Sequence, residues 1–399
     1  MRSTRRLAAR LARAFAGRRI PARPTGAALL CAAALLTASC GERPASEPDW
    51  PPGLSVVGRT QALAHLLARL ERLEPTRLAQ GAREIRRALP ACGSVEGRAA
   101  NGHPAELREG LACRSGDATF GRLDRERGED DLAFVWNPEG GAPVRGSISI
   151  GPDGDLELAL RLERASFTGA RALLRPGAAA AGPGVLSTRE TLIHARLRPE
   201  GGLPIADLVP RGSQADRLFR LKSALFAGTV LEGTWEAAVY PPETARTMPR
   251  AALALGVVRR DAAAAAIEAF VRELLAAWPV HRSFFSVGGA TGACLLDLNV
   301  LPELAPCYVA TERALVVGWN PASLRKALDG QPAPPVAEAA GATVDFERIA
   351  EADARLAGRL SPGSGRLPLA VPWRRLVARG RRVGDEVHVQ LTLVSGART

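Results

Sequence analysis

The sequence predicts an α+β fold of two related halves, each an antiparallel sheet packed with amphipathic helices. Leucines three and four residues apart indicate helices, and runs of alternating apolar and polar residues indicate half-buried strands. Two of these runs are similar, because "GDLELALRLE" (154–163) and "GDEVHVQLTLV" (384–394) both place Gly-Asp before a strict alternation. We interpret this similarity as a diverged repeat, although two hairpins in a β-rich chain can also look alike by chance.

Two helices are predicted near the start of the N-terminal half. The first covers residues 60–74 and ends before Pro75, and the second begins at Thr76 and ends at Pro90. The apolar stripe of the first helix consists of Leu63, Leu66, Leu67, Leu70 and Leu73. Such a stripe can bind a partner helix, but packing on the protein's own sheet is its more common use.

The strands of the N-terminal half follow these helices. Residues 132–136 form one predicted strand, and residues 147–150 and 156–162 form a hairpin with Pro-Asp-Gly at its turn. Residues 175–184, "RPGAAAAGPG", have low complexity and no hydrophobic periodicity. They are therefore the predicted boundary between the two halves.

The C-terminal half is predicted to mix strands and helices by the same criteria. Its strands are expected at 191–197, 233–240, 252–258, 283–287, 293–298, 307–310, 314–317, 344–346, 376–383 and 386–394. Its helices are expected at 214–225, 261–278, 321–328 and 347–356. The third of these helices opens with Pro321, which suits the first helical position because that position needs no N–H donor.

These elements and the composition predict four regions along the chain. Residues 1–39 form a signal peptide, and residues 40–53 form an extended tether rich in proline and glycine. Residues 54–180 form an N-terminal α+β domain, and residues 185–399 form a C-terminal α+β domain. A length of 399 residues is sufficient for two domains of this kind.

The start of the chain resembles an export signal that ends in a lipid-attachment site. Basic residues within 2–23 precede an apolar run at 27–38, which is too short for a permanent membrane helix of roughly twenty residues. Small residues then lead to Cys40, as in the bacterial lipoprotein box, whose cysteine is acylated and becomes the first residue. Thr37 stands where that box usually has leucine, so plain cleavage and an uncleaved anchor are the alternatives.

The net charge of +12 does not indicate a nucleic-acid-binding protein. Of the 53 basic residues, eight arginines lie before Cys40 in a stretch without acidic residues, which leaves 45 basic against 41 acidic residues. Aromatic residues make up only 5% of the chain and do not alternate with basic clusters. We therefore expect no nucleic-acid partner.

The cysteines favour two local disulfides in an oxidising compartment. The chain has Cys31, Cys40, Cys92, Cys113, Cys294 and Cys307. Cys31 would leave with the leader and Cys40 would carry lipid, and the remaining four allow three connectivities. The economical connectivity joins Cys92 to Cys113 and Cys294 to Cys307. Four buried free thiols are the alternative, and zinc is less favoured because no histidine stands at ligand spacing.

No catalytic, metal-binding or cofactor-binding motif is present in the sequence. The segment "GGATG" (288–292) lies between two predicted strands rather than before a helix, and "PDGD" (152–155) lacks further calcium ligands, so both are predicted turns. The histidines are scattered, at His65, His103, His194, His281 and His388. His194 and His388 could act as general bases only beside a carboxylate or serine, and a structural or surface role is expected for each.

Three segments resemble a loosely defined family of exported bacterial proteins of unknown function. They are "TLIHARLRPEGGLPIADLVP" (191–210), "TERALVVGWNPASLRKALDG" (311–330) and the closing hairpin. Members of that family repeat a unit of strand, helix and antiparallel meander, and the resemblance covers roughly residues 185–399. It implies an α+β envelope protein and supplies no catalytic residues.

The sequence thus predicts a non-enzymatic lipoprotein of the bacterial envelope with a binding or scaffold role. Gly41, with no aspartate at this position, favours the periplasmic face of the outer membrane. Its expected partners are the membrane, through the lipid on Cys40, and an envelope protein or an apolar ligand. The alternatives are a periplasmic carrier with a cavity between sheet and helices, and a hydrolase with an unrecognised site.

Overall fold

A computed structural model describes the greater part of the chain after residue 52, and every described residue lies in one compact unit, Ala38–Thr399. The described residues are 53–73, 77–99, 110–115, 118–137, 143–151, 153–163, 184–198, 231–244, 247–277, 280–287, 289–297, 305–329, 340–357, 373–384 and 386–396. The leader, Cys40, His103 and the predicted helix at 214–225 lie outside them. The fold class is α+β, with one large antiparallel sheet.

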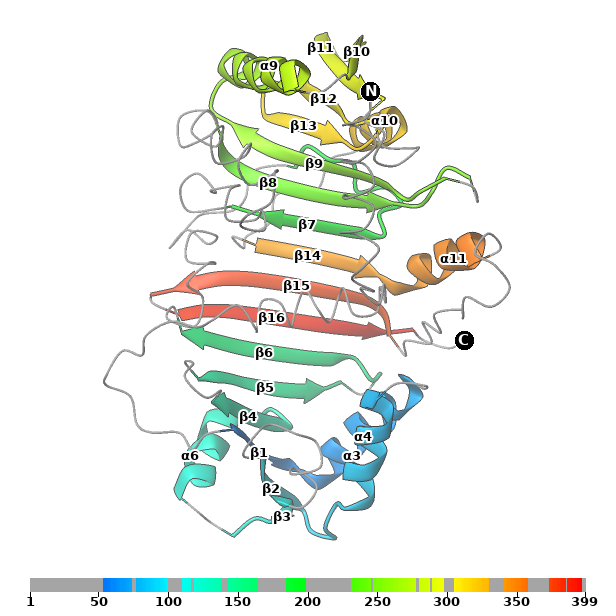
Figure 1. Cartoon of the computed structure of the whole chain (residues 1–399). Coiled ribbons are helices and arrows are strands. Elements are labelled where there is room, and N and C mark those ends of the chain that lie inside the picture. The colour runs from blue at the N-terminus through cyan, green and yellow to red at the C-terminus, as the bar shows by residue number, and fades with distance from the viewer. Residues whose placement is uncertain are drawn as a thin grey trace, which may run out of the picture. The chain divides into compact units, whose positions relative to one another are not determined.

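Sixteen strands of the described residues form this sheet, in the order β10-β11-β12-β13-β9-β8-β7-β14-β15-β16-β6-β5-β4-β1-β2-β3 (Figure 1). In its N-terminal part the strands are β1 (Gly53–Arg59), β2 (Ser94–Ala99), β3 (Ala112–Cys113), β4 (Leu132–Asn137), β5 (Val144–Ile150) and β6 (Leu156–Glu163). In its C-terminal part they are β7 (Ile193–Leu197), β8 (Leu231–Tyr240), β9 (Arg250–Val257), β10 (His281–Val287), β11 (Ala290–Leu296), β12 (Cys307–Ala310), β13 (Ala314–Gly318), β14 (Ala340–Asp345), β15 (Trp373–Val383) and β16 (Glu386–Ser395).

The last strand of the chain joins the two parts of the sheet. β16 pairs antiparallel with β6 from Glu386 opposite Glu163 to Leu393 opposite Leu156. The two segments whose sequences resemble each other are therefore direct neighbours at this seam. β14, β15 and β16 fill the space between β6 and β7, although β6 and β7 are consecutive strands in the described chain (Figure 1). The common origin of the two halves stays a prediction.

Six α-helices of the described residues accompany the sheet. They are α3 (Thr60–Leu70), which continues into the short 3₁₀ helix η1 (Glu71–Leu73), α4 (Arg77–Arg87), α6 (Ala118–Arg127), α9 (Arg260–Ala277), α10 (Pro321–Leu328) and α11 (Phe346–Ala357). At the end of the sheet that contains β9–β13, α9 and α10 cover opposite faces. Leu255 of β9 packs in the cluster that contains α9, and the preceding Ala254 packs in the cluster that contains α10. Neighbouring strand residues point to opposite faces, so both faces are covered here.

Helices also cover both faces at the other end of the sheet. Leu132 of β4 packs with Leu63 of α3 and Ile85 of α4, whereas the next residue, Ala133, packs with Leu123 of α6. Following the strand pairing across the sheet places α3, α4 and α9 on one face, which we call the first face. The same register places α6 and α10 on the other, which we call the second face.

Between the two ends, the faces of the sheet differ in polarity. Leu160 and Leu162 of β6 point to the first face and are buried, whereas Arg161 between them points to the second face and is exposed. In β15, Arg379 and Arg381 lie on the second face and are exposed as well. Alternation in β6 therefore gives an apolar first face, whereas Arg161, Arg379 and Arg381 place positive charge on the second face.

Most elements predicted in the described part of the chain are present, with ends that shift by a few residues. The helix at 321–328 and the strand at 307–310 have the predicted bounds. β2, β3 and α6 were not predicted, and neither was β1, which begins at Gly53, the last residue of the predicted tether. β1 escapes a periodicity search because glycines stand near both ends of its short apolar core, "LSVV".

Candidate ligand-binding cleft

The predicted cysteine pairs come together at disulfide distance. Cys92, just before β2, pairs with Cys113 of β3, and their Cα atoms are 5.9 Å apart. Cys294 of β11 and Cys307 of β12 are directly opposite each other in the strand pairing, with Cα atoms 3.9 Å apart. Disulfides persist in oxidising compartments, so both pairs indicate an exported protein.

The histidines of the described residues do not meet at one site. His194 of β7 lies 3.5 Å from a carboxylate oxygen of Glu236, His281 of β10 lies 2.9 Å from Asp297, and His388 of β16 lies 2.8 Å from Glu386. These three pairs belong to different strands, and each carboxylate is within reach of only one of the three. His65 lies on α3, separate from all three pairs.

Glu236 is the centre of a buried polar cluster on the second face. Its carboxylate accepts hydrogen bonds from the amides of Val185 (2.5 Å) and Leu186 (2.9 Å) and from Nε of Arg196 (3.0 Å). Burial raises the pKa of Glu236, but the imidazole of His194, the two amides and the charge of Arg196 outweigh it and hold the pKa below its ordinary value. The cluster fixes residues 185–186 onto the sheet, which is a structural role.

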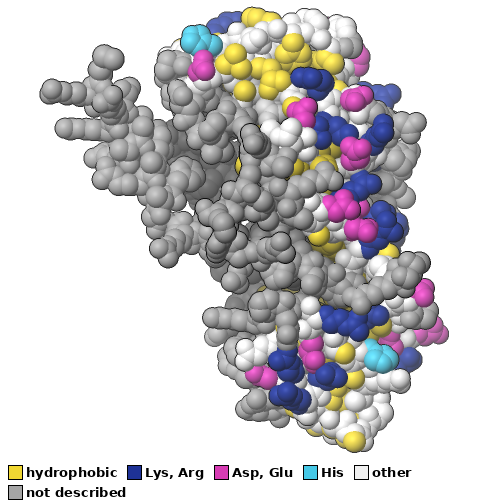
Figure 2. Space-filling view, turned by 90° about the vertical axis from the view of Figure 1, so that its right-hand side faces the viewer, with side chains coloured by type: hydrophobic (Ala, Val, Ile, Leu, Met, Phe, Trp, Pro, Cys, Tyr) yellow, Lys and Arg dark blue, Asp and Glu magenta, His cyan; other side chains and the backbone are white. Residues whose placement is uncertain are grey.

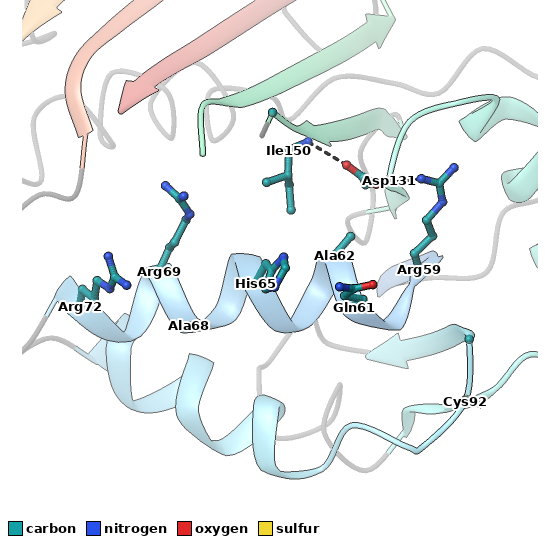
Figure 3. A pocket seen from close by; sticks show the side chains of 12 residues that line it. Arg59, Gln61, Ala62, His65, Ala68, Arg69, Arg72, Cys92, Asp131 and Ile150 are labelled. Carbon is teal, nitrogen blue, oxygen red and sulfur yellow. Dashed lines mark hydrogen bonds and ion pairs between the residues drawn. The ribbon is translucent and has the colours of Figure 1, made fainter. Parts of the chain in front are cut away.

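A cleft of about 650 Å³ lies along α3 at one end of the strands (Figure 3). One wall is the outward side of α3 and η1, with Arg59 at its start and Arg72 at its end. The opposite wall consists of residues where strands begin or end, namely Cys92, Gly93, Asp131, Ile150 and Gly151. The volume is in the range of small-molecule binding sites.

The amphipathic sequence of α3 explains which side chains line the cleft. Ala62, Leu63 and Leu67 are the buried residues of α3, and Leu63 and Leu67 pack in the core with α4. Positions four residues apart on the other side of the helix are Gln61, His65 and Arg69. The spacing that buries the leucines therefore presents these polar side chains along the cleft.

Arg59 and Asp131 form one end of the cleft. Nη1 of Arg59 lies 3.3 Å from Oδ1 of Asp131, and the Arg59 amide donates to the Asp131 carbonyl at 3.0 Å. Oδ2 of Asp131 accepts the amide of Ile150 at 2.9 Å, as Figure 3 shows. Both carboxylate oxygens of Asp131 are therefore already engaged.

Arg69 is held in place near the other end of the cleft. Its Nη1 donates to the backbone carbonyl of Gly154 at 2.6 Å. Gly154 has φ +82°, and a Cβ at this position would overlap the Arg69 guanidinium. The Gly154 amide donates to the Gly151 carbonyl at 2.8 Å, so a turn is present here, as predicted, and Gly154 is what allows Arg69 to approach the backbone.

The cleft contains an excess of basic side chains. Arg59, Arg69, Arg72 and His65 line it, and Asp131 is its one acidic lining residue. Among the described residues, the side chains of His65 and Arg72 have no hydrogen-bond or ion-pair partner. Elsewhere on the surface seen in Figure 2, basic and acidic side chains are interspersed. The sequence contained the signal for this site in the i, i+4, i+8 spacing of 61, 65 and 69, opposite the leucine stripe.

The described residues contain neither a candidate metal site nor a helix that could span a membrane. No group of three or more His, Cys, Asp or Glu side chains in this part of the chain is placed to hold a metal ion. No described helix is long and apolar enough to cross a membrane. A comparison with protein-family models, curated proteins and solved structures found no match.

Proposed function

We propose that this protein is a non-enzymatic binding protein of the bacterial cell envelope, held on the membrane by lipid on Cys40. The observation that supports a binding role is the cleft along α3, which combines a ligand-sized volume with four basic side chains, of which His65 and Arg72 have no side-chain partner among the described residues. The two disulfides support an address outside the cytoplasm. Gly41 favours the periplasmic face of the outer membrane.

The cleft lies at the end of β1 opposite the residue at which the predicted tether ends. The tether would enter β1 at Gly53, and Arg59 at the other end of β1 lines the cleft. A strand of seven residues spans roughly 20 Å at about 3.3 Å per residue. The cleft and the end of the predicted tether are therefore separated by the length of β1.

The anchor is tested by removing the acylated residue. Cys40→Ala should release the protein from the membrane fraction into the soluble envelope fraction, whereas Cys31→Ala, which lies inside the leader, should leave it on the membrane. Fractionation and immunoblotting measure both. Membrane retention of Cys40→Ala would overturn the anchor.

The binding role is tested by hydrogen–deuterium exchange on the full chain, alone and mixed with a soluble envelope extract. We expect slower exchange of the α3 amides and of the segment around Gly93 in the mixture. The amides of α10, at the other end of the sheet, are the internal control and should not change. Unchanged exchange in α3 would count against the cleft as a binding site.

A second candidate function is a carrier of an apolar ligand. The observation that favours it is the apolar first face of β6, where Leu156, Leu160 and Leu162 are buried and Leu158 between them is half-buried. A carrier should retain lipid through purification, and mass spectrometry of a solvent extract would detect it. Protein that is free of lipid after gentle purification would exclude this candidate.

A further inference from the structure

We infer that the α3 cleft binds an extended ligand with negatively charged oxygens, carboxylate or phosphate, at both of its ends. This inference rests on the proposed role of the cleft as a binding site and names the chemistry of its ligand. Three independent features of the described residues support it: the position of the basic side chains, the neutralisation of the one acidic lining residue, and the orientation of α3.

The basic side chains lie at the two ends of the cleft. Arg59 precedes α3, and Arg69 and Arg72 lie near its other end and in η1, as Figure 3 shows. Thirteen residues at about 1.5 Å per residue separate Arg59 and Arg72 by roughly 20 Å along the helix. Between them, Ala62, Ala68 and Ile150 contribute apolar lining, and His65 is the polar group in the middle. The lining therefore fits a ligand with charged ends and a less polar centre.

The acidic residue of the cleft does not oppose an anion. Oδ1 of Asp131 faces Arg59, and Oδ2 accepts the Ile150 amide, so the carboxylate and the guanidinium offset each other's charge and no uncompensated negative charge lines the cleft. A guanidinium offers five N–H donors, so Arg59 can bind a second carboxylate or phosphate while it contacts Asp131. At the other end, Arg69 uses Nη1 for the Gly154 carbonyl and is thereby fixed at the cleft.

The orientation of α3 adds to this positive potential. Its first turn contains no acidic residue, and no side chain caps its N-terminus. The residues of that turn that line the cleft are Gln61 and Ala62. The N-terminus of a helix carries a partial positive charge and favours anions near it. The helix dipole and Arg59 therefore act in the same direction at this end.

Isothermal titration calorimetry on the full chain tests the inference with two series of probes. The carboxylate series is succinate, suberate and dodecanedioate, and the phosphate series is the bisphosphates of butanediol, octanediol and dodecanediol, so that within each series the length changes and the charged ends do not. We expect at least one series to bind, with affinity that rises with length and falls with added NaCl, because exposed charge pairs are screened by salt. The series that binds more tightly identifies the chemistry of the ligand.

Two charge-reversal variants, one in the cleft and one outside it, test whether the cleft is where the probes bind. Arg72→Glu should weaken binding of the longest probe about tenfold or more, because a hydrogen-bonded charge contact is lost and a repulsion is introduced. Arg87→Glu, an equally exposed reversal on α4 outside the cleft, should leave binding within about twofold. Gly154→Ala, which changes no charge but displaces Arg69, should also weaken binding.

The outcomes separate this inference from the proposed function. If neither series binds, or if Arg72→Glu and Arg87→Glu behave alike, the anionic ligand is wrong. In that case, slower exchange of α3 in envelope extract would still support a binding site for another kind of ligand. If α3 exchange is also unchanged, the proposed binding role fails together with the inference.

Discussion

Glu236 and Arg196 form an ion pair in which both side chains are 2% exposed, with 3.0 Å between Oε1 and Nε. Glu236 lies on β8 and Arg196 on β7, and the two residues are directly opposite each other in the strand pairing. The same carboxylate holds the amides of Val185 and Leu186. One buried side chain therefore connects two strands of the sheet to the segment that leads into β7.

Removing this carboxylate should destabilise the fold strongly. Glu236→Ala removes the carboxylate that faces the buried Arg196 and leaves the amides of Val185 and Leu186 without their acceptor, so we expect a loss of about 3–5 kcal/mol in the free energy of unfolding. Urea denaturation monitored by circular dichroism measures it. Glu190→Ala is the control, because Glu190 is 51% exposed in its pair with Lys326 and should cost less than about 1 kcal/mol. Equal losses in the two variants would contradict the structural role of Glu236.

The lowered pKa of Glu236 predicts a loss of stability in acid. Burial alone would raise this pKa, but the interactions with His194, Leu186, Val185 and Arg196 hold it below the ordinary value of 4.5. Stability from this group is therefore present above the unfolded pKa and is lost as pH falls through the folded pKa. Denaturation between about pH 3 and pH 6 should show a steeper decline in the native protein than in Glu236→Gln. Parallel curves for the two would show that other carboxylates control acid unfolding.

Both tyrosines of the chain should resist ionisation in the folded protein. Tyr240 is fully buried and Tyr308 is 6% exposed, and burial raises the pKa of each well above its usual value of 10. The folded state therefore prefers the protonated phenols, and stability should be lost as pH rises above about 10. Absorbance at 295 nm should stay flat near pH 11 until the protein unfolds. A native transition near pH 10 would place a tyrosine at the surface.

The disulfide between β11 and β12 should contribute measurably to stability. Cys294 and Cys307 are 13 residues apart, and closing a loop of this length stabilises a fold by roughly 3 kcal/mol in the chain-entropy model. The double variant Cys294→Ala/Cys307→Ala should lower the urea midpoint accordingly. Peptide mapping without reductant should recover the linked peptides 92–113 and 294–307. Free thiols at these positions in the exported protein would contradict the pairing.

The N-cap of α10 should contribute less to the free energy of unfolding than the Glu236 cluster does. Oδ1 of Asn320 accepts hydrogen bonds from the amide and the hydroxyl of Ser323, both at 2.8 Å. Asn320→Ala removes this N-cap and should cost about 1 kcal/mol. Asn320→Asp keeps an acceptor at the cap and should be close to neutral by the same denaturation assay. A loss of equal size in both variants would indicate that the amide group has another role.

The helices and strands with strong periodicity could be predicted from the sequence because their own residues determine them. α10 is an example, since Asn320, Pro321 and the following apolar spacing mark its start and its buried side. β2 and α6 could not be predicted in this way, because their sequences, "SVEGRA" and "ATFGRLDRER", contain few apolar residues and pack mainly against residues far away in the sequence. Local patterns do not record such contacts.

The candidate site, too, could be predicted only in part from the sequence. The outward spacing of Gln61, His65 and Arg69 is visible in the sequence, and so are the cysteine pairs. The opposite wall is not, because Asp131 and Ile150 reach α3 only after β1 pairs with β4, and β4 with β5. The pairing of Glu236 with Arg196 could not be predicted for the same reason, since 40 residues separate the two in the sequence.

The position of β14, β15 and β16 has a consequence for how the molecule assembles. The ribosome makes these strands last, yet they stand between β6 and β7, which are made much earlier. Without them, the other described strands fall into two separate pieces of sheet, each with an unpaired inner edge. Such edges are sites of aggregation. A chain that stops before residue 386 would keep the edge of β6 open permanently, so the C-terminal strand acts as the closure of the whole sheet.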